Sequence, residues 1–190
     1  MPIAEAMTRT LPAAGLLGIV LIGGVSSLYE WSHQDAVASD ELLPHKSAWL
    51  NLPGYAIRMI VAFAEKNGAG GKSRILGPGG ARVQPGAAAL ANGALAHAFE
   101  MDNLTWPNTG VHPGATLLSS ALAVAQERGI GGRELIAAVV AGSEVMIRIG
   151  RATKHNNETR GFHAPGTTGP FGAAVACGRL MGFDAERMRN

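Results

Sequence analysis

The chain has 190 residues, 47% of them hydrophobic and 16% charged, a balance typical of a folded chain with a core of its own. Aromatic residues make up only 5% while glycine contributes 26 residues, which favours closely packed helices over a β-sandwich. A net charge of +2 argues against a dedicated nucleic-acid binder. The charge is uneven: residues 1–53 carry two Lys or Arg against five Asp or Glu (−3), and residues 54–190 carry fourteen against nine (+5).

The N-terminal segment, residues 1–53, is the least informative part of the chain. Leu11 to Tyr29 is strongly apolar, so a signal peptide or membrane anchor is one interpretation. Pro12 and several glycines weaken this stretch as a membrane span, and we therefore expect a core helix there. Residues 32–53 show no periodicity and are predicted to be a loop.

The first clear helix is Tyr55–Asn67, with apolar residues at helical spacing and Gly68 placed to end it. The glycine-rich segment that follows contains two short extended pieces, Ser73–Leu76 and Ala81–Val83. Its GGKS tetrapeptide resembles part of a phosphate-binding loop, but Lys66 stands where that motif requires glycine. We therefore predict a β-hairpin near residues 73–84.

The remainder predicts a mostly α-helical fold, with prolines opening helices and glycines ending them. The Arg133–Ile149 segment is apolar on most faces and is expected to be the central helix, with Glu144 and Arg148 pairing on one face. The single cysteine, Cys177, excludes an internal disulfide and a Cys-ligated cluster, and its apolar surroundings predict a buried, inert thiol. Further helices are expected at Pro85–Ala98, Pro113–Arg128 and Thr168–Met181, followed by a capped turn from Asp184.

A first polar loop interrupts the stretch Ala89–Gly114, between two apolar helices. Carboxylates and a histidine held in this way suit acid–base chemistry, in which one group removes a proton beside a carboxylate and another protonates a departing hydroxyl. His97, on the apolar helix before the loop, is interpreted as a core histidine. The loop itself holds Glu100, Asp102, Asn103, Thr105 and His112.

A second polar loop is predicted from Arg151 to Thr168, and we expect the two loops to form the walls of one cavity. Basic side chains gather in and beside it and could bind an anion with several carboxylates. His163 lies in GFHAPGTTG, where glycine and proline fix the backbone, so we favour a functional histidine. A metal site is the weaker interpretation, because the histidines and acids match no usual zinc spacing. The basic cluster consists of Arg148, Arg151, Lys154, His155, Arg160 and His163.

Several stretches together resemble one family. ALANGALAHAFEMDN, VHPG, GRELIAAVVAGSEVMIRIG and RGFHAPGTTGPFGAAVACGRLMGFD occur in the order and at the separations seen in the MmgE/PrpD family. That family includes 2-methylcitrate dehydratase, cis-aconitate decarboxylase and iminodisuccinate epimerase. The resemblance covers residues 55–190 and implies a helical domain, a smaller α+β lid domain and a homodimer with the active site between the domains. It also implies loss of water or carbon dioxide from small di- or tricarboxylates, or epimerisation of a related substrate, without an iron–sulfur cluster. We accordingly expect no cofactor.

Carried over by position, the family's HxxDxDD motif falls on His97, Glu100, Asp102 and Asn103, and two further histidines fall on His112 and His163. The resemblance implies acid–base roles for His112 and His163, with Glu100 and Asp102 positioning or polarising. The sequence departs from the family motif at two positions, where Glu100 and Asn103 stand in place of aspartates. Catalysis is sensitive to the placement of such groups at about the ångström level. The residues expected to bind substrate are Asn103, Thr105, Lys154, Arg160 and Thr167.

Taken together, the sequence predicts a cytoplasmic lyase that dehydrates a 2-methylcitrate-like acid, as in propionate metabolism. A decarboxylase or epimerase of the same family, or a non-catalytic fragment or subunit that needs a partner chain, remains an alternative. Residues 1–53 match the family poorly, residues 54–190 correspond to part of the helical domain, and the lid domain is expected to be absent. We therefore expect little activity from this chain alone, no nucleic-acid or membrane partner, and either a homodimer or a completing chain.

Overall fold

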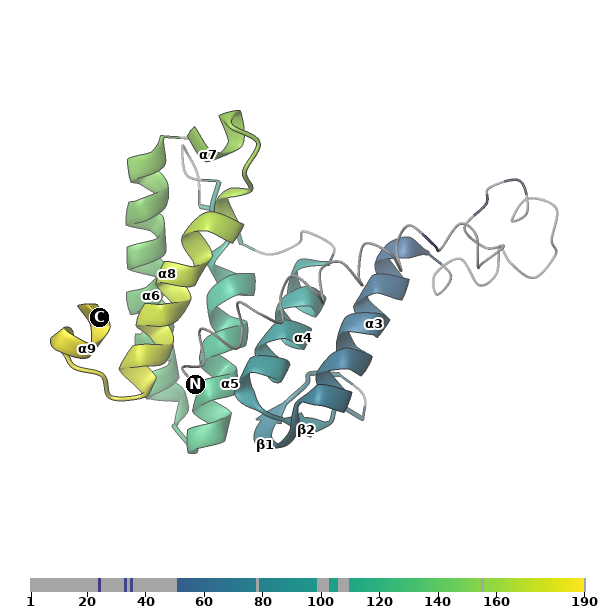
Figure 1. The fold of residues 1–190 in the computed structure, drawn as a ribbon. Coiled ribbons are helices and arrows are strands. Elements are labelled where there is room, and N and C mark those ends of the chain that lie inside the picture. Colours follow the sequence, from purple (N-terminus) through teal and green to yellow (C-terminus); the bar gives the residue numbers. More distant parts are fainter. Residues whose placement is uncertain are drawn as a thin grey trace. The chain divides into compact units, whose positions relative to one another are not determined.

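A computed structural model describes residues 51–77, 79–98, 103–105, 110–154 and 156–189, together with Gly24, His33 and Asp35 (Figure 1). The chain divides into two compact units, Met1–Ala56 and Ile57–Asn190, and the second holds the elements discussed below apart from the start of the first helix. Except for Gly24, the apolar stretch 11–29 lies outside the described residues, so the helix expected there stays a prediction. No helix among the described residues is both long and apolar enough to cross a membrane.

The described fold starts with helix α3, Leu52–Asn67, and a two-stranded antiparallel sheet, β1 (Ala69–Arg74) and β2 (Arg82–Val83). This confirms the predicted hairpin in place of a phosphate-binding loop. The hairpin is attached to a later helix through Glu127, whose carboxylate accepts hydrogen bonds from the Lys72 N–H (2.7 Å) and the buried Ser73 hydroxyl (3.4 Å).

The helices predicted from Tyr55 onward are confirmed, with shifts at their ends. The segment after Pro113 opens as a π-helix and continues as an α-helix, and Gly129 ends it with a φ of 66°. The second polar loop is the main correction, because most of residues 151–168 is helical and the long helix predicted from Thr168 already begins at Ala164, next to Pro165. The elements are α4 (Pro85–His97), η3 (Gly114–Leu118), α5 (Ser119–Arg128), α6 (Gly132–Thr153), α7 (Asn156–Thr159), α8 (Ala164–Leu180) and α9 (Ala185–Arg189).

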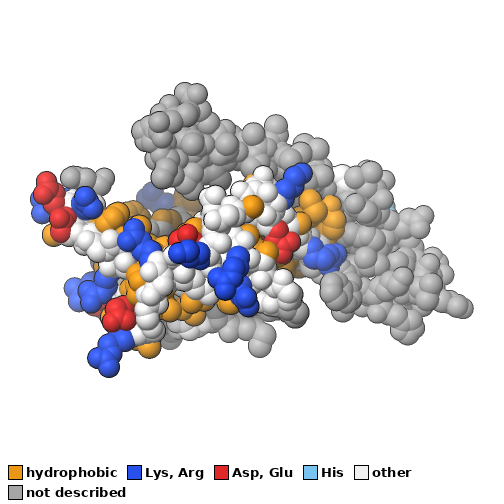
Figure 2. Space-filling model, turned by 90° about the horizontal axis from the view of Figure 1, so that it is seen from below, with side chains coloured by type: hydrophobic (Ala, Val, Ile, Leu, Met, Phe, Trp, Pro, Cys, Tyr) orange, Lys and Arg blue, Asp and Glu red, His pale blue; other side chains and the backbone are white. Residues whose placement is uncertain are grey.

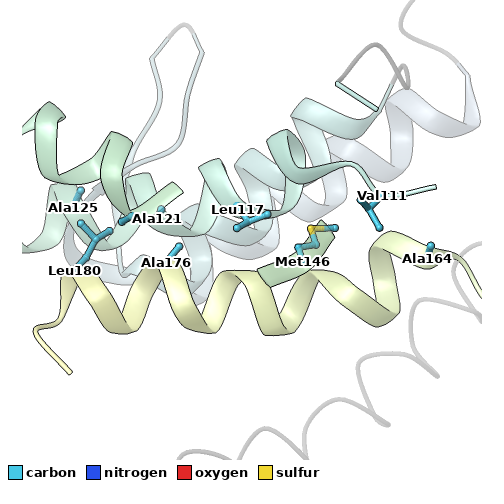
Figure 3. Packing of buried hydrophobic residues seen from close by; sticks show 9 residues of the cluster. Val111, Leu117, Ala121, Ala125, Met146, Ala164, Ala176 and Leu180 are labelled. Atoms are coloured by element: carbon cyan, nitrogen blue, oxygen red, sulfur yellow. The ribbon is translucent and has the colours of Figure 1, made fainter. Parts of the chain in front are cut away.

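Helix α5 occupies the centre of this unit, with α4 and the hairpin on one side and α6 and α8 on the other (Figure 1). Leu117, Ala121 and Ala125 belong to a cluster with side chains from α6 and α8, shown in Figure 3. Ala123, on another face of α5, packs in a second cluster with α3, α4 and the hairpin. The prediction that the 133–149 helix is central is wrong: Ile136 of α6 is 67% exposed.

Helices α6 and α8 approach each other closely through small residues. A Cβ added to Gly142 would meet the side chain of Leu117, the carbonyl oxygen of Gly172 and the Cβ of Ala176. Met146, fully buried, fills the adjoining space (Figure 3). This close contact fixes the position of the first turn of α8, which begins directly after His163.

Two local predictions also have clear outcomes. Glu144 and Arg148 form the expected pair at 2.6 Å, with both side chains exposed. Cys177 is partly buried rather than fully buried. Burial raises the pKa of its thiol, and a hydrogen bond with the Ser120 side chain lowers that pKa by a smaller amount. The raised pKa supports the prediction of an inert thiol.

Candidate active site

Three imidazole rings meet at one place in the second unit. The ring centroids of His97 and His112 lie 5.5 Å apart, those of His97 and His163 lie 5.7 Å apart, and those of His112 and His163 lie 6.4 Å apart. The three residues come from the end of α4, the segment before η3 and the position before α8. Side chains separated by up to 66 positions in the sequence (97 to 163) thus form one cluster.

The backbone around His112 is held on both sides. Before it, Val111 is fully buried and forms an isolated antiparallel bridge with Thr105, whose N–H donates to the Val111 carbonyl at 3.1 Å. After it, the Thr116 hydroxyl donates to the His112 carbonyl at 3.0 Å. The Asn103 side-chain oxygen accepts a 2.8 Å hydrogen bond from the Gly114 N–H at the start of η3. These contacts fix the direction from which the His112 ring leaves the chain.

His163 is held by the start of α8 and by the short helix α7. It is the N-cap of α8, with extended backbone angles (φ −76°, ψ 120°), and its carbonyl accepts hydrogen bonds from Gly166 and Thr167. In α7, Asn157 connects to α8 through a 2.9 Å hydrogen bond from its amide to the Thr167 hydroxyl. Gly161, at φ 81°, makes the turn between α7 and His163. Proline and glycine therefore do fix this backbone, as the sequence predicted.

The imidazoles line a cavity of about 480 Å³ between α4, η3 and α8. His97 and His112 are half-buried, with Nε2 of His97 and Nδ1 of His112 fully buried, whereas His163 is exposed. His112 from the first predicted polar loop and His163 from the second thus line the same cavity. The chemistry available there is that of several adjacent imidazoles, each able to accept or donate a proton or to bind a carboxylate.

The structure does not bring all the other predicted site residues to this cavity. Lys154 and Arg160 are exposed and do not line it, so their part in binding an anion stays a prediction. Thr167 is engaged with Asn157, and Thr105 with Val111. The first loop is described only at residues 103–105 and 110–114. Glu100 and Asp102 lie outside the described residues, as does His155.

The exposed basic side chains lie mostly elsewhere on the molecule. Figure 2 shows one face on which Lys and Arg side chains outnumber the acidic ones, in keeping with the excess of positive charge in residues 54–190. Among the described residues, no Lys or Arg lines the cavity that contains the imidazoles. Among the described residues that line this cavity, the imidazoles are therefore the only side chains that can carry a positive charge.

Comparison with known families gives one decisive match. A model of the MmgE/PrpD N-terminal domain matches residues 50–190, which is most of the chain. The chain belongs to the MmgE/PrpD family. No curated protein gives a significant match to it. Membership in MmgE/PrpD confirms the family that the sequence motifs indicated, and the matched region includes all three histidines of the cluster.

His97 is the site residue that our reading of the sequence undervalued. Its place on an alanine-rich helix suggested a core histidine, yet its ring lies within 5.7 Å, centroid to centroid, of both other rings. One signal was available: His97 is the first position of the family's acidic motif and the last residue of α4. His97 lines the cavity at the end of α4, together with Leu90 and Gly93 of the same helix.

Proposed function

We propose that this MmgE/PrpD chain provides the imidazole half of a lyase site that dehydrates a 2-methylcitrate-like polycarboxylate. The observation that carries the proposal is the cluster of three imidazoles around one cavity, with ring centroids 5.5 to 6.4 Å apart. Family membership supports a dehydratase-like reaction. Elimination of water uses both a proton acceptor and a proton donor, and adjacent imidazoles supply both. An epimerase would use the same two groups without a leaving group, so formation of the unsaturated acid distinguishes the two reactions.

In the proposed reaction one imidazole, that of His112 or His163, removes a proton from the carbon next to a carboxylate. The electron pair of the broken C–H bond forms a carbon–carbon double bond, and the C–O bond to the hydroxyl group on the neighbouring carbon breaks. The other imidazole donates a proton to that hydroxyl, which leaves as water. The rings of His112 and His163 lie on different elements, so that both can contact a single substrate of a few carbons.

His97 is assigned to binding rather than to proton transfer. Its ring contacts both other imidazoles and has a buried Nε2, so a proton on this ring would place positive charge beside a bound carboxylate. We propose that Glu100 and Asp102 position or polarise the substrate, as the family motif implies. The exposed Lys154 and Arg160 are not needed for this step.

The remaining positive charge that a polycarboxylate requires is proposed to come from outside the described residues. Several fixed cations match a small tricarboxylate best. Among the described residues that line the cavity, the imidazoles are the only side chains that can carry a positive charge. A second domain, a second copy of this chain or a separate completing chain could each supply these cations. Sedimentation of the purified protein, alone and with 2-methylcitrate, tests the second copy, because it distinguishes a dimer from a monomer.

The proposal is tested by titrating the purified chain with 2-methylcitrate while recording the imidazole resonances by NMR. We expect the resonances of His97, His112 and His163 to shift together and to saturate. The matched control is the triethyl ester of 2-methylcitrate, in which the three carboxylates are esterified. It should leave the imidazole resonances unshifted. Unchanged imidazole resonances at saturating acid would refute the assignment. Formation of the unsaturated acid, followed by ultraviolet absorbance, reports turnover in the same samples.

A further inference from the structure

Away from the histidines, the cavity described above is lined by small and apolar residues. The residues that line it come from α4, from η3 and the start of α5, and from α8. Leu90, on α4, is 49% exposed at this position. An apolar side chain exposed at the edge of a cavity is stabilised when a ligand covers it. We call this part of the cavity the apolar groove; it comprises Leu90, Gly93, Ala115, Gly169, Pro170 and Ala173.

The two hydroxyl groups near the groove are already committed to the backbone. The Thr116 hydroxyl donates to the His112 carbonyl at 3.0 Å, and the Ser119 hydroxyl donates to the Ala115 carbonyl at 2.6 Å. Neither proton is available to a ligand. Among the described residues that line the cavity there is also no Asp, Glu, Lys or Arg. A charged or hydroxylated group placed in the groove would lose hydration without a matching partner, whereas an alkyl group would lose nothing.

The volume of the cavity exceeds what a compact acid requires. Its 480 Å³ lies within the range of about 300–1,000 Å³ that accommodates ligands of drug size. A small carboxylic acid that contacts the imidazoles therefore leaves the apolar groove unfilled. The polar end and the apolar groove belong to one continuous cavity, so one ligand can occupy both.

We propose that the substrate of this chain carries an alkyl substituent longer than methyl, which lies in the apolar groove while the carboxylates contact the three imidazoles. The inference rests on the proposed function, because it takes the imidazole cluster as the carboxylate end. It adds the chemical class of the substrate: a 2-alkyl polycarboxylate with a chain of several carbons. Gly93 and Ala173, both small, lie among the residues that line this groove.

The test measures the dissociation constants of citrate, 2-methylcitrate and 2-butylcitrate for the 190-residue chain by isothermal titration calorimetry. Burial of a methylene group strengthens binding by up to about fourfold, so we expect 2-butylcitrate to bind at least about tenfold more tightly than 2-methylcitrate. In parallel NMR samples all three acids should shift the imidazole resonances, and only the butyl compound should shift the methyl resonances of Leu90.

Two variants with opposite effects on the groove make the test specific. Ala173→Leu narrows the groove and should remove the advantage of the butyl compound over 2-methylcitrate. Ala174→Leu, the matched control on the exposed side of α8, should leave this advantage unchanged. Leu90→Ala removes a wall at a half-exposed position without threatening the fold, and it should also reduce the butyl advantage.

The outcomes separate this inference from the proposed function. If the acids shift the imidazole resonances but bind equally well whatever the alkyl length, the inference is wrong and the proposed function stands. If the butyl compound binds more tightly but its methyl contacts fall outside the groove, or if Ala173→Leu leaves its advantage intact, the inference is also wrong. If no acid shifts the imidazole resonances, both fail.

Discussion

The Asn103 side-chain oxygen accepts a 2.8 Å hydrogen bond from the Gly114 N–H, which joins the first part of the first polar loop to the helix that follows His112. At a helix start the first N–H groups lack partners within the helix, and a side-chain oxygen that satisfies one of them stabilises the terminus. The resemblance suggested Asn103 as a substrate-binding residue. The structure instead gives this oxygen a positioning role, because it holds the N–H of Gly114, two residues after His112.

Removal of this bond should loosen the segment that carries His112. For Asn103→Ala we expect a loss of about 1 kcal/mol in the free energy of unfolding, faster exchange of the Gly114 amide proton and a shifted His112 resonance. Asn103→Asp should retain the bond, since a carboxylate oxygen also accepts it and suits a helix N-terminus. Asn67→Ala, which removes an exposed side chain bonded to Phe63, is the control and should leave His112 unchanged. Equal His112 spectra in all three variants would contradict the positioning role.

The contact between α6 and α8 predicts an unusual response to alanine. In an exposed helix interior, glycine to alanine stabilises by about 1 kcal/mol. At Gly142 the added Cβ would overlap the Leu117 side chain and the Gly172 carbonyl, so we expect Gly142→Ala to destabilise by about 1–3 kcal/mol. Gly132→Ala, at the start of α6 where nothing lies within 4 Å, is the matched control and should be neutral or stabilising. Denaturant unfolding of both variants measures the difference, and a stable Gly142→Ala protein would contradict the close packing.

The raised pKa of Cys177 predicts slow alkylation of the folded protein. Only the thiolate reacts, and burial, which raises the pKa, reduces the thiolate fraction at neutral pH below that of an ordinary cysteine. Iodoacetamide should therefore modify the native chain more slowly than the urea-unfolded chain, and the native rate should rise as the pH is raised. Ser120→Ala removes the hydrogen bond that lowers the pKa, so it should slow the native reaction further. An increased rate in that variant would contradict the assigned causes.

The helices could be predicted from local signals, whereas their order from centre to edge could not. Proline before a helix and glycine after it set the ends near Pro85, Pro113 and Gly129. The central position of α5 depends on which faces find partners, and α6 is richer in large apolar residues although Ile136 and Val140 remain exposed. A prediction from apolar content therefore puts α6 at the centre. The helix found there is α5, because its small residues, such as Ala121 and Ala123, allow the closest packing.

For the site, sequence reasoning identified the histidines that lie in rigid, irregular segments and missed the one on a helix. His112 and His163 stand beside prolines and glycines that fix their backbone, which is a local signal. The inclusion of His97 depends on how α4 ends relative to α8, which is a tertiary relationship. Lys154 was proposed from its charge alone, yet it is the C-cap of α6 with a left-handed backbone and an exposed side chain.

The binding of 2-methylcitrate should depend on imidazoles and not on exposed lysines. Replacement of His97, His112 or His163 by Gln keeps a polar side chain of similar size but removes a group that can become positively charged. Hydrogen bonds to charged groups contribute about 1.5–3 kcal/mol, so each substitution should weaken binding by about tenfold or more. Lys154→Gln, at an exposed position outside the cavity, should weaken it by less than about twofold.

Calorimetric titration of the wild-type chain and of each variant with 2-methylcitrate measures these losses of affinity. If Lys154→Gln lost as much affinity as His112→Gln, the basic segment after α6 rather than the imidazole cluster would hold the acid, because an exposed lysine can weaken binding to that extent only by contacting the ligand itself.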